Sequence, residues 1–464
     1  MKKGNRLTLY IIIALVLGII LGYILNQSYV KEENTTLAAS EERIAALNTT
    51  IKNTTDTTSA QFIQFKKERG EQVKIKNKAL SDRNSKTDPF SLLADIFLRL
   101  IKMIVAPLVF FTLVVGVAKL GDIKAVGRIG GKTLLWFISA SLASLLLGMV
   151  LVNIFQPGIA MKLPLPDEGT DTGIAKTALS LREFLYHVFP SSVVDSMAKN
   201  EILQIVIFSL FFGVATAAIG ETGHKIIKAF DAIAHVVLKI TGYVMNFAPV
   251  AVFGAMTAII ARQGLGILKT YSIFIGEFYF GLLLLWMILI IAGSVFIKKR
   301  IIDLMKRIKE PVLLAFSTSS SEAAFPKTMV ELEKFGCKDK IVSFVLPLGY
   351  SFNLDGSMMY MTFASLFIAQ SYGIHLDFGT QLSMLLVLML TSKGIAGVPR
   401  ASLVVIAGTL ATFNIPEAGL ALLLGIDPLL DMGRSATNVV GNSIATAVVS
   451  KWEGELTEPK PNLI

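Results

Sequence analysis

Five polar or charged side chains lie on one face of a predicted helix near the C-terminal end of the chain. They belong to the segment DPLLDMGRSATNVVGNSIAT, residues 427–446, and follow one another at spacings of four, three, four and four: Asp427, Asp431, Arg434, Asn438 and Asn442. Helical periodicity places all five on one stripe. A charge at mid-bilayer costs at least ~2.5 kcal/mol, so this stripe must face a polar interior. A helix-packing ion pair between Asp431 and Arg434 is the simpler alternative, but it leaves the third charge and both amides unexplained. We therefore predict one wall of a binding site for a charged molecule.

The composition is that of a polytopic membrane protein. Of the 464 residues, 53% are hydrophobic and 17% are charged, against roughly 25% charged residues in soluble domains. Apolar runs of about 20 residues recur, and each is long enough to cross a bilayer. The net charge of +10 is explained by basic residues in cytoplasmic loops, and no basic patch with interleaved aromatic residues indicates nucleic-acid binding. The single cysteine excludes an internal disulfide, and the four histidines have no metal-ligand spacing. A metal enzyme is therefore disfavoured.

The first apolar run predicts a membrane helix rather than a cleaved signal peptide. Lys2, Lys3 and Arg6 precede it, it is too long for a signal peptide, and no cleavage site follows. The basic start places the N-terminus on the cytoplasmic side of the cell membrane. Apolar runs predict six spans before residue 300, at residues 7–25, 90–118, 134–155, 202–219, 233–260 and 271–296. The fifth contains Pro249, which a membrane helix tolerates where neighbours satisfy the freed backbone groups.

Residues 27–88 interrupt this pattern with a polar insert. The triplet Asn-Thr-Thr occurs there three times, and the Lys/Glu-rich segment KKERGEQVKIKNK follows. The predicted sidedness makes the insert extracellular, and EERIAALNTTI within it has the pattern of an amphipathic helix. We expect a solvated, partly mobile extension without a role in transport.

Two apolar segments in the last third are interrupted at their centres. LLAFSTSSSEAAFP, residues 313–326, has a serine-rich tip, and residues 384–413 have a Gly/Pro/Ser-rich tip between two short apolar arms. Neither arm alone spans about 30 Å of hydrocarbon. Each segment predicts a re-entrant hairpin, because irregular backbone at membrane depth must be buried or line a cavity. A loop of the kind found in soluble proteins is the alternative for either segment alone. Two such segments in corresponding positions indicate a transporter site built from inverted repeats.

Between these segments, PLGYSFNLDGSMMYMTF (residues 347–363) places polar side chains in an apolar run. Asn353, Asp355 and Ser357 lie beside Gly349 and Gly356. Glycines permit local unwinding, which exposes backbone carbonyls next to a carboxylate, and hard cations prefer such oxygen ligands. A turn between two half-helices is the alternative, and it is compatible with a cation site.

Four motifs resemble the dicarboxylate/amino acid:cation symporter family: TSSSEAAFP (318–326), SFNLDGS (351–357), GIAGVP (394–399) and DMGRSATNVVGN (431–442). The resemblance covers nearly the whole chain outside 27–88. It implies an all-α membrane protein with eight transmembrane helices, two opposed re-entrant hairpins from inverted repeats, a homotrimer, and an elevator movement of a transport domain. The expected division is a first transmembrane helix (1–26), the insert (27–88), scaffold and early helices 2–6 (89–300), hairpin 1 (301–338), helix 7 (339–372), hairpin 2 (373–416), helix 8 (417–452) and a cytoplasmic tail (453–464).

The resemblance also implies roles for substrate-binding residues. Arg434 would grip a side-chain carboxylate, for which a guanidinium offers bidentate contacts. Asp431 would take an amino group. The α-carboxylate would be held by a further set: Asn438, Ser320, Ser321 and the backbone at Val398. Ser357 and Ser435 stand where the family commonly has threonine, and each keeps a hydroxyl near the ligand.

The implied cation-binding neighbourhood comprises Ser141, Gly349, Asn353, Asp355, Asp427, Asn438 and Asn442, with sodium ligands expected at Gly349, Asn353, Asp355 and Asn438. No cofactor is expected beyond the coupling ion. This sequence departs from sodium-driven members at several positions: Asn442 for Asp, Ala140 for Thr, Phe137 for Tyr, Ile395 for Thr and Arg400 for Gly. Oxygen ligation is weaker there, so coupling to protons, to sodium or to both stays open. The candidate proton carriers are Asp355, Asp427, Asp431 and Glu322.

Substrate choice turns on Asp431. An unpaired carboxylate would repel a C4-dicarboxylate, which has no amino group, so we expect glutamate or aspartate, with succinate-like dicarboxylates as the alternative and cystine or a neutral amino acid third.

An enzyme with Ser320, His375 and Asp355 as a triad is disfavoured because no GxSxG elbow is present. A ligand-gated channel is disfavoured because the polarity is concentrated beneath two hairpins. The expected partners are thus a small anionic substrate and the lipid bilayer.

Overall fold

The computed structural model describes residues 3–54, 59–120, 123–161, 165–166, 188–264, 270–392 and 401–459. Within these ranges the regular structure is helical, and the one β feature is an isolated bridge between Cys337 and Leu456. The all-α prediction is therefore confirmed for the described chain.

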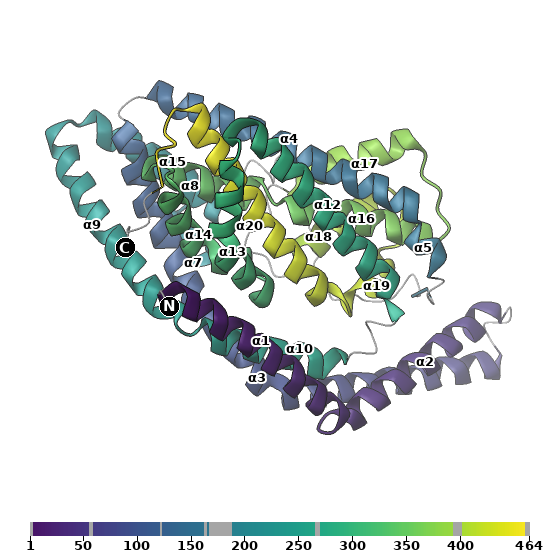
Figure 1. Cartoon of the computed structure of the whole chain (residues 1–464). Coiled ribbons are helices and arrows are strands. Elements are labelled where there is room, and N and C mark those ends of the chain that lie inside the picture. Colours follow the sequence, from purple (N-terminus) through teal and green to yellow (C-terminus); the bar gives the residue numbers. More distant parts are fainter. Residues whose placement is uncertain are drawn as a thin grey trace.

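The N-terminal part forms a long arm attached to the body of the protein (Figure 1). Helix α1 (Lys3–Gln27) packs against α10, and α2 (Lys31–Asn53) packs against the first half of α3 (Ala60–Leu120), a continuous helix of 61 residues. Leu37 and Leu47 on α2 and Phe62 on α3 are buried. The described part of the polar insert is thus a two-helix hairpin. Charged composition did not predict it, because a few apolar residues per helix are enough to pair two helices.

The middle of the chain supplies the helices that surround the last third. They are α4 (Ile123–Phe155), α5 (Pro157–Ala160), α7 (Val193–Lys199), α8 (Ile202–Ala218), α9 (Glu221–Met245), α10 (Ala248–Gln263) and α12 (Ser272–Ile297). The predicted span 233–260 is not one straight helix, because α9 and α10 meet at an angle of 50°; whether the pair forms one bent span stays a prediction. Pro249 is the second residue of α10, where its missing N–H and fixed φ favour a new helix start rather than continuation of α9.

By length and apolar composition, four described helical segments are able to cross a membrane: Leu9–Gln27, Ala60–Lys119, Lys124–Ala160 and Ser272–Ile297. The bent pair α9–α10 makes a fifth if it is counted as one span. The count of eight transmembrane helices stays a prediction, because the remaining helices are shorter or interrupted.

The last third consists of paired half-helices around a central helix. These elements are α13 (Arg300–Thr318), α14 (Ser321–Phe335), α15 (Asp339–Phe352), α16 (Asp355–Ser371), α17 (Phe378–Thr391), α18 (Ala401–Thr412), the 3₁₀ turn η2 (Glu417–Leu420), α19 (Ala421–Leu424) and α20 (Asp427–Trp452). The chain leaves α13 at Ser319, whose φ of 50° is left-handed, and α14 packs back against α13. The expected unwinding is present at Asn353 and Leu354, between α15 and α16.

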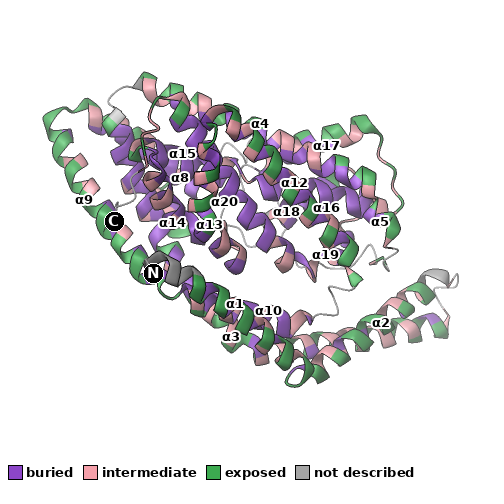
Figure 2. Ribbon diagram, viewed as in Figure 1, coloured by how far each residue is buried: buried purple, intermediate pink, exposed green. Residues whose placement is uncertain are grey.

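Helix α20 is the centre of this arrangement. It packs against α12, α13, α14, α15, α16 and α4, and every residue from 432 to 450 is buried. Figure 2 shows α20 as an almost uniformly buried ribbon among partly exposed helices. A helix that is buried on all sides can carry charged residues only where partners or a cavity receive them.

Candidate substrate and cation site

The predicted polar stripe lies on one continuous helix, α20. Asp427, Arg434, Asn438 and Asn442 are buried, each with at most 4% of its surface exposed. Asp431 differs, because 40% of its side chain is exposed. The stripe is therefore internal, with one carboxylate that faces open space.

Arg434 is the centre of the first polar cluster. Its Nη2 lies 3.1 Å from Asp427 Oδ1 and 2.9 Å from Asp431 Oδ1. The guanidinium carbon lies 4.1 Å from the centre of the Tyr360 ring, and the Tyr360 hydroxyl donates to Asp427 Oδ1 at 3.1 Å. The ion pair that was the simpler alternative is thus present, but it engages one guanidinium nitrogen. Arg434 Nε and Nη1 are buried without a protein partner, and buried donors of this kind are suited to an anionic ligand.

A cavity of about 230 Å³ adjoins this cluster. Asp427, Pro428 and Asp431 of α20 line it together with Thr318 and Ser319 at the end of α13. Its other wall comes from α3 and α10 and includes Ser91, Asp95 and Arg262. The cavity therefore lies between the hairpin tip and helices α3 and α10, which precede the last third of the chain.

The serine-rich tip is close to α20, but only some of its hydroxyl residues line the cavity, while another caps a helix. Ser320 Oγ caps α14 by accepting a hydrogen bond from the Ala323 N–H at 3.2 Å, and Ser321 is the first residue of α14. Ser319 and Thr318 are the tip residues that line the cavity. Sequence reasoning missed these two because a run of five hydroxyl residues, 317–321, does not indicate which of them face the cavity.

Asn438 fixes the start of α16. Its Oδ1 accepts hydrogen bonds from the N–H groups of Gly356, at 2.9 Å, and Ser357, at 3.4 Å, while its Nδ2 donates to Ser357 Oγ at 3.3 Å. The first N–H groups of a helix lack intrahelical partners, so this amide satisfies two of them. Ser435 is buried beside Arg434 on α20. Val398, with Ile395 and Arg400, lies outside the described residues, and its assigned role stays a prediction.

The second polar cluster lies at the unwound joint between α15 and α16. Asn353 Nδ2 donates to Asp355 Oδ2 at 2.9 Å and to Asn442 Oδ1 at 3.2 Å. The Asn353 N–H donates to the Gly349 carbonyl at 2.8 Å, and this backbone bond ends α15 at the joint. The predicted Asn353, Asp355, Gly349 and Asn442 therefore lie together.

Helix α4 adds two hydroxyl groups to the second cluster. Ser144 Oγ donates to Asp355 Oδ1 at 3.4 Å, and Ser141 Oγ donates to the Phe352 carbonyl at 3.4 Å. Ser141 was predicted to belong here. Ser144 was not, although it lies one helical turn after Ser141, on the same face of the helix.

This second cluster offers hard oxygen ligands in a dry environment. Asn353, Asp355 and Asn442 are at most 1% exposed, and Asn353 Oδ1 has no protein partner. Within the described ranges, no group of three or more His, Cys, Asp or Glu residues is placed to hold a metal ion. Amide and carbonyl oxygens around one carboxylate suit a monovalent cation such as Na⁺, or a proton on Asp355, better than a transition metal.

Two glycines make the close packing of this cluster possible. A Cβ atom on Gly441 would lie 1.9 Å from Asp355 Oδ2, and one on Gly349 would lie 2.3 Å from Asn442 Oδ1. Both distances are far below a van der Waals contact. Glycine at these two positions therefore lets the Asp355 carboxylate and the Asn442 amide pack directly against neighbouring backbone.

Comparisons with known proteins agree with this arrangement. Residues 7–452 match the profile of the Sodium:dicarboxylate symporter family. A C4-dicarboxylate transport protein of Geobacter sp. (strain M21) is 44% identical over 372 residues, which cover 78% of this chain and 84% of the relative. A C4-dicarboxylate transport protein of Bacillus subtilis (strain 168) is 41% identical, with 79% and 88% covered. A proton/sodium-glutamate symport protein of Geobacillus stearothermophilus is 42% identical, with 79% and 89% covered. These matches confirm the resemblance seen in the four motifs: the chain belongs to the sodium:dicarboxylate symporter family.

Proposed function

We propose that this protein is a secondary active symporter that carries C4-dicarboxylates, such as succinate, malate or fumarate, together with protons or sodium ions. The observation that carries the proposal is the pair of buried, unpartnered donors on Arg434, Nε and Nη1. A carboxylate is the ligand that such donors bind best, because charge-assisted hydrogen bonds are about twice as strong as neutral ones.

The expectation of an acidic amino acid rested on repulsion by Asp431, and the relatives favour the other choice. Two of the three relatives described above are named C4-dicarboxylate transport proteins. Asp431 Oδ1 also lies 2.9 Å from Arg434 Nη2. Its charge is thus paired, which weakens the argument that it would repel a second carboxylate.

Glutamate or aspartate is the second candidate substrate, and one observation favours it. The Asp431 carboxylate is 40% exposed and lines the cavity, so it has room to accept hydrogen bonds from an ammonium group. The relative from Geobacillus stearothermophilus is named a proton/sodium-glutamate symport protein. A neutral amino acid or cystine is third, because a neutral amino acid lacks a second carboxylate and none of the relatives described above is named as a carrier of either.

Charge balance supports coupling to cations. Asp355, Asp427 and Asp431 bring three carboxylates to the two clusters, and Arg434 brings the one guanidinium among their described residues. A dicarboxylate would add two further negative charges to a buried site, which is costly without counter-charges. We assign the counter-charge to Na⁺ at Gly349, Asn353, Asp355, Asn438 and Asn442, or to protons on Asp355, Asp427, Asp431 or Glu322.

The remaining expectations follow from the family resemblance. They are a homotrimer in the cell membrane with a cytoplasmic N-terminus, and an elevator movement of a transport domain against a fixed scaffold. The cavity between α13, α20, α3 and α10 lies where such a boundary would run.

Uptake into liposomes tests the substrate and the coupling ion together. Purified protein would receive labelled succinate, aspartate or glutamate under a sodium gradient or a proton gradient alone. We expect succinate to accumulate under at least one gradient. Accumulation of aspartate without succinate would overturn the C4-dicarboxylate proposal, and equilibration of either substrate without accumulation would indicate a channel.

Asp431→Asn is the variant that separates the two substrate classes. It removes the negative charge and keeps the size of the side chain. A C4-dicarboxylate carrier is expected to retain succinate uptake, whereas an amino acid carrier loses the partner of the ammonium group and with it aspartate uptake. Lys225→Gln, an exposed change on α9, is the matched control for expression and reconstitution.

A further inference from the structure

A second cavity lies on the side of α20 that faces away from the polar stripe. It measures about 480 Å³ and lies between α12, α13 and α20, which pack against one another and lie together in Figure 1. From α20 it is lined by Gly433, Ala436 and Thr437. At 100° per residue, Gly433 and Ala436 lie about 140° and about 160° from the middle of the polar stripe, and Thr437 lies about 100° from it. This cavity is therefore separate from the proposed substrate site.

Apart from Lys309, the wall of this cavity is apolar, and its other polar side chains already have protein partners. The Tyr279 hydroxyl donates to the Leu429 carbonyl at 2.6 Å, and Trp286 Nε1 donates to Thr437 Oγ1 at 2.8 Å. The other lining residues include Leu282, Met305, Ile308, Leu313 and Phe316. A hydrophilic solute would find almost no hydrogen-bonding partner here, whereas a hydrocarbon chain would lose nothing on entry.

The cavity is continuous with a surface suited to the bilayer interior. Helix α12 is one of the segments long and apolar enough to span a membrane. It exposes Leu283, Met287 and Ile291 to 63%, 55% and 58%, at spacings of four that form one apolar face. Leu283 also lines the cavity. An acyl chain from the bilayer can therefore enter from this face.

The end of α12 and the first half of α13 carry four exposed lysines, and within the described chain none of them makes an ion pair: Lys298, Lys299, Lys306 and Lys309. Lys298 and Lys299 directly follow the spanning helix α12, where basic residues are common. Lys306 and Lys309 lie inside α13, and Lys309 itself lines the cavity. Lys309 is about 14 Å along the helix from Arg300, at 1.5 Å per residue. No described carboxylate forms an ion pair with the Lys309 ammonium group. This positive charge is therefore available to an anion.

We propose that this cavity binds one anionic phospholipid, with an acyl chain between α12, α13 and α20 and its phosphate at Lys309. Basic pockets between membrane helices are suited to anionic headgroups. The acyl chain would pack against α20 at Gly433 and Thr437, which are close to Arg434 in the sequence.

Quenching of Trp286 fluorescence tests this proposal without measuring transport. Trp286 lines the cavity, so Trp136→Phe and Trp452→Phe in the full chain would leave it as the one tryptophan, since the chain has three. The protein would be reconstituted into vesicles that contain brominated phosphatidylglycerol or brominated phosphatidylcholine. We expect half-maximal quenching at about fivefold lower mole fraction for phosphatidylglycerol, as one lysine–headgroup contact predicts.

Variants at Lys309 supply the controls. Lys309→Gln is expected to make the two lipids equally effective, Lys309→Arg to keep the preference, and Lys225→Gln to leave it unchanged. Equal quenching by both lipids in the otherwise unmodified protein would overturn the proposal, as would a preference that survives Lys309→Gln. Absence of quenching by either lipid would also overturn it, because protein from a second copy or from the same chain would then cover the cavity.

Discussion

At the scale of single residues, the main feature of the site is that the Arg434 guanidinium uses only one of its three nitrogens to bind protein carboxylates. One nitrogen holds both Asp427 and Asp431, and the Tyr360 ring covers the guanidinium. This arrangement orients the side chain and leaves Nε and Nη1 without protein partners. An arginine that is fixed in this way can recognise a carboxylate with little further ordering.

Arg434→Lys is expected to lower the rate of substrate uptake by about 10- to 100-fold. Lysine keeps the charge, but it cannot hold two aspartates and present further donors at the same time, so one or two charge-assisted hydrogen bonds are lost. Initial uptake rates per reconstituted protein measure the effect, with Lys225→Gln as the control. Rates within a factor of about two of the wild type would rule out carboxylate recognition by Arg434.

Gly441→Ala is expected to weaken the cation response. Its Cβ would lie 1.9 Å from Asp355 Oδ2, so the carboxylate must move away from Asn353. Alanine by itself favours a helix by about 1 kcal/mol, and a loss would therefore come from the clash. The measurement is the cation concentration or pH at half-maximal uptake.

Gly242→Ala on α9 is the matched control for this change, because no neighbouring atom lies within 4 Å of the position that its methyl group would take. An unchanged cation response in Gly441→Ala would place the coupling ion away from Asp355.

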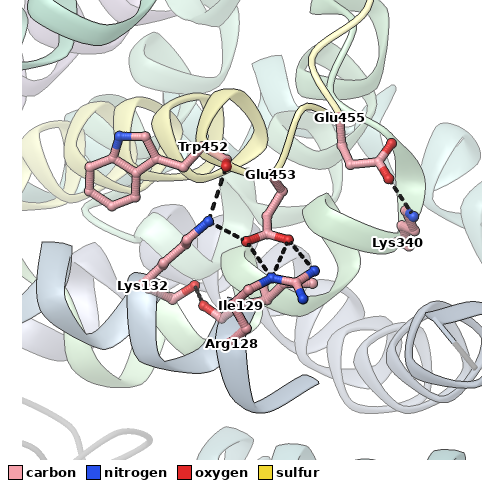
Figure 3. A network of polar contacts seen from close by, with 8 residues as sticks. Arg128, Ile129, Lys132, Lys340, Trp452, Glu453 and Glu455 are labelled. Atoms are coloured by element: carbon pink, nitrogen blue, oxygen red, sulfur yellow. Dashed lines mark hydrogen bonds and ion pairs between the residues drawn. The ribbon is translucent and has the colours of Figure 1, made fainter. Parts of the chain in front are cut away.

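At the scale of elements, α20 is anchored at its C-terminal end by a network of charges (Figure 3). Glu453 lies 2.8 Å from Arg128 and 2.7 Å from Lys132, both on α4. Glu455 pairs with Lys338 and, at 2.6 Å, with Lys340. The end of the helix that carries the polar stripe is thereby tied to α4 and to the α14–α15 connection.

Glu453→Gln is expected to lower the free energy of unfolding by about 1–2 kcal/mol at neutral pH, because two charge-assisted contacts become neutral ones. Burial acts to raise the pKa of Glu453, but hydrogen bonds from Arg128 and Lys132 outweigh it and hold the pKa below its ordinary value of 4.5. Its contribution is therefore complete above about pH 4.5 and is lost as the pH falls through the lower folded-state pKa.

Thermal unfolding in detergent at neutral and acidic pH measures this effect. The difference between Glu453→Gln and the wild type should shrink below pH 4.5. Glu458→Gln, an exposed change nearby, is the control. A difference that stays constant across this range would show that the pairing of Glu453 with α4 does not stabilise the fold.

At the scale of the whole molecule, the arm formed by α2 and the start of α3 continues into the body along α3, and polar contacts also hold its base. Arg83 Nη1 donates to the Arg262 carbonyl at 3.0 Å and to Asn34 Oδ1 at 3.3 Å. Arg262 in turn pairs with Asp88 at 3.0 Å and lines the cavity of about 230 Å³ beside Asp427 and Asp431. The base of the arm therefore belongs to the body of the protein, while its outer part lies apart from the site.

Removal of residues 38–79, with a short Gly-Ser turn in their place, is expected to leave substrate uptake within about twofold of the wild type. The base contacts of Asn34, Arg83 and Asp88 remain in this variant. Uptake and elution volume on size exclusion are the measurements. Loss of uptake by a protein of normal elution volume would give the outer arm a role in transport.

The sequence by itself determined the membrane class, the family and the polar face of α20. These properties are local: hydrophobic runs define possible spans, and spacings of three and four residues place Asp427 to Asn442 on one helical face whatever packs around them. The interruption at Asn353 was predictable for the same reason, since glycines and short polar residues weaken a helix where they stand.

The tertiary structure decided the partners, because these depend on segments far apart in the chain. Ser144 meets Asp355 across 211 residues, and Ser319 rather than Ser320 lines the cavity because the Ser320 hydroxyl is used to cap α14. The pairing of α2 with α3 also required three-dimensional packing. Asp431 shows the difference most clearly. Its type, its position and its possible pairing with Arg434 were evident from the sequence, but the exposure of 40% of its side chain beside the cavity depends on how α3, α10 and α13 pack around it.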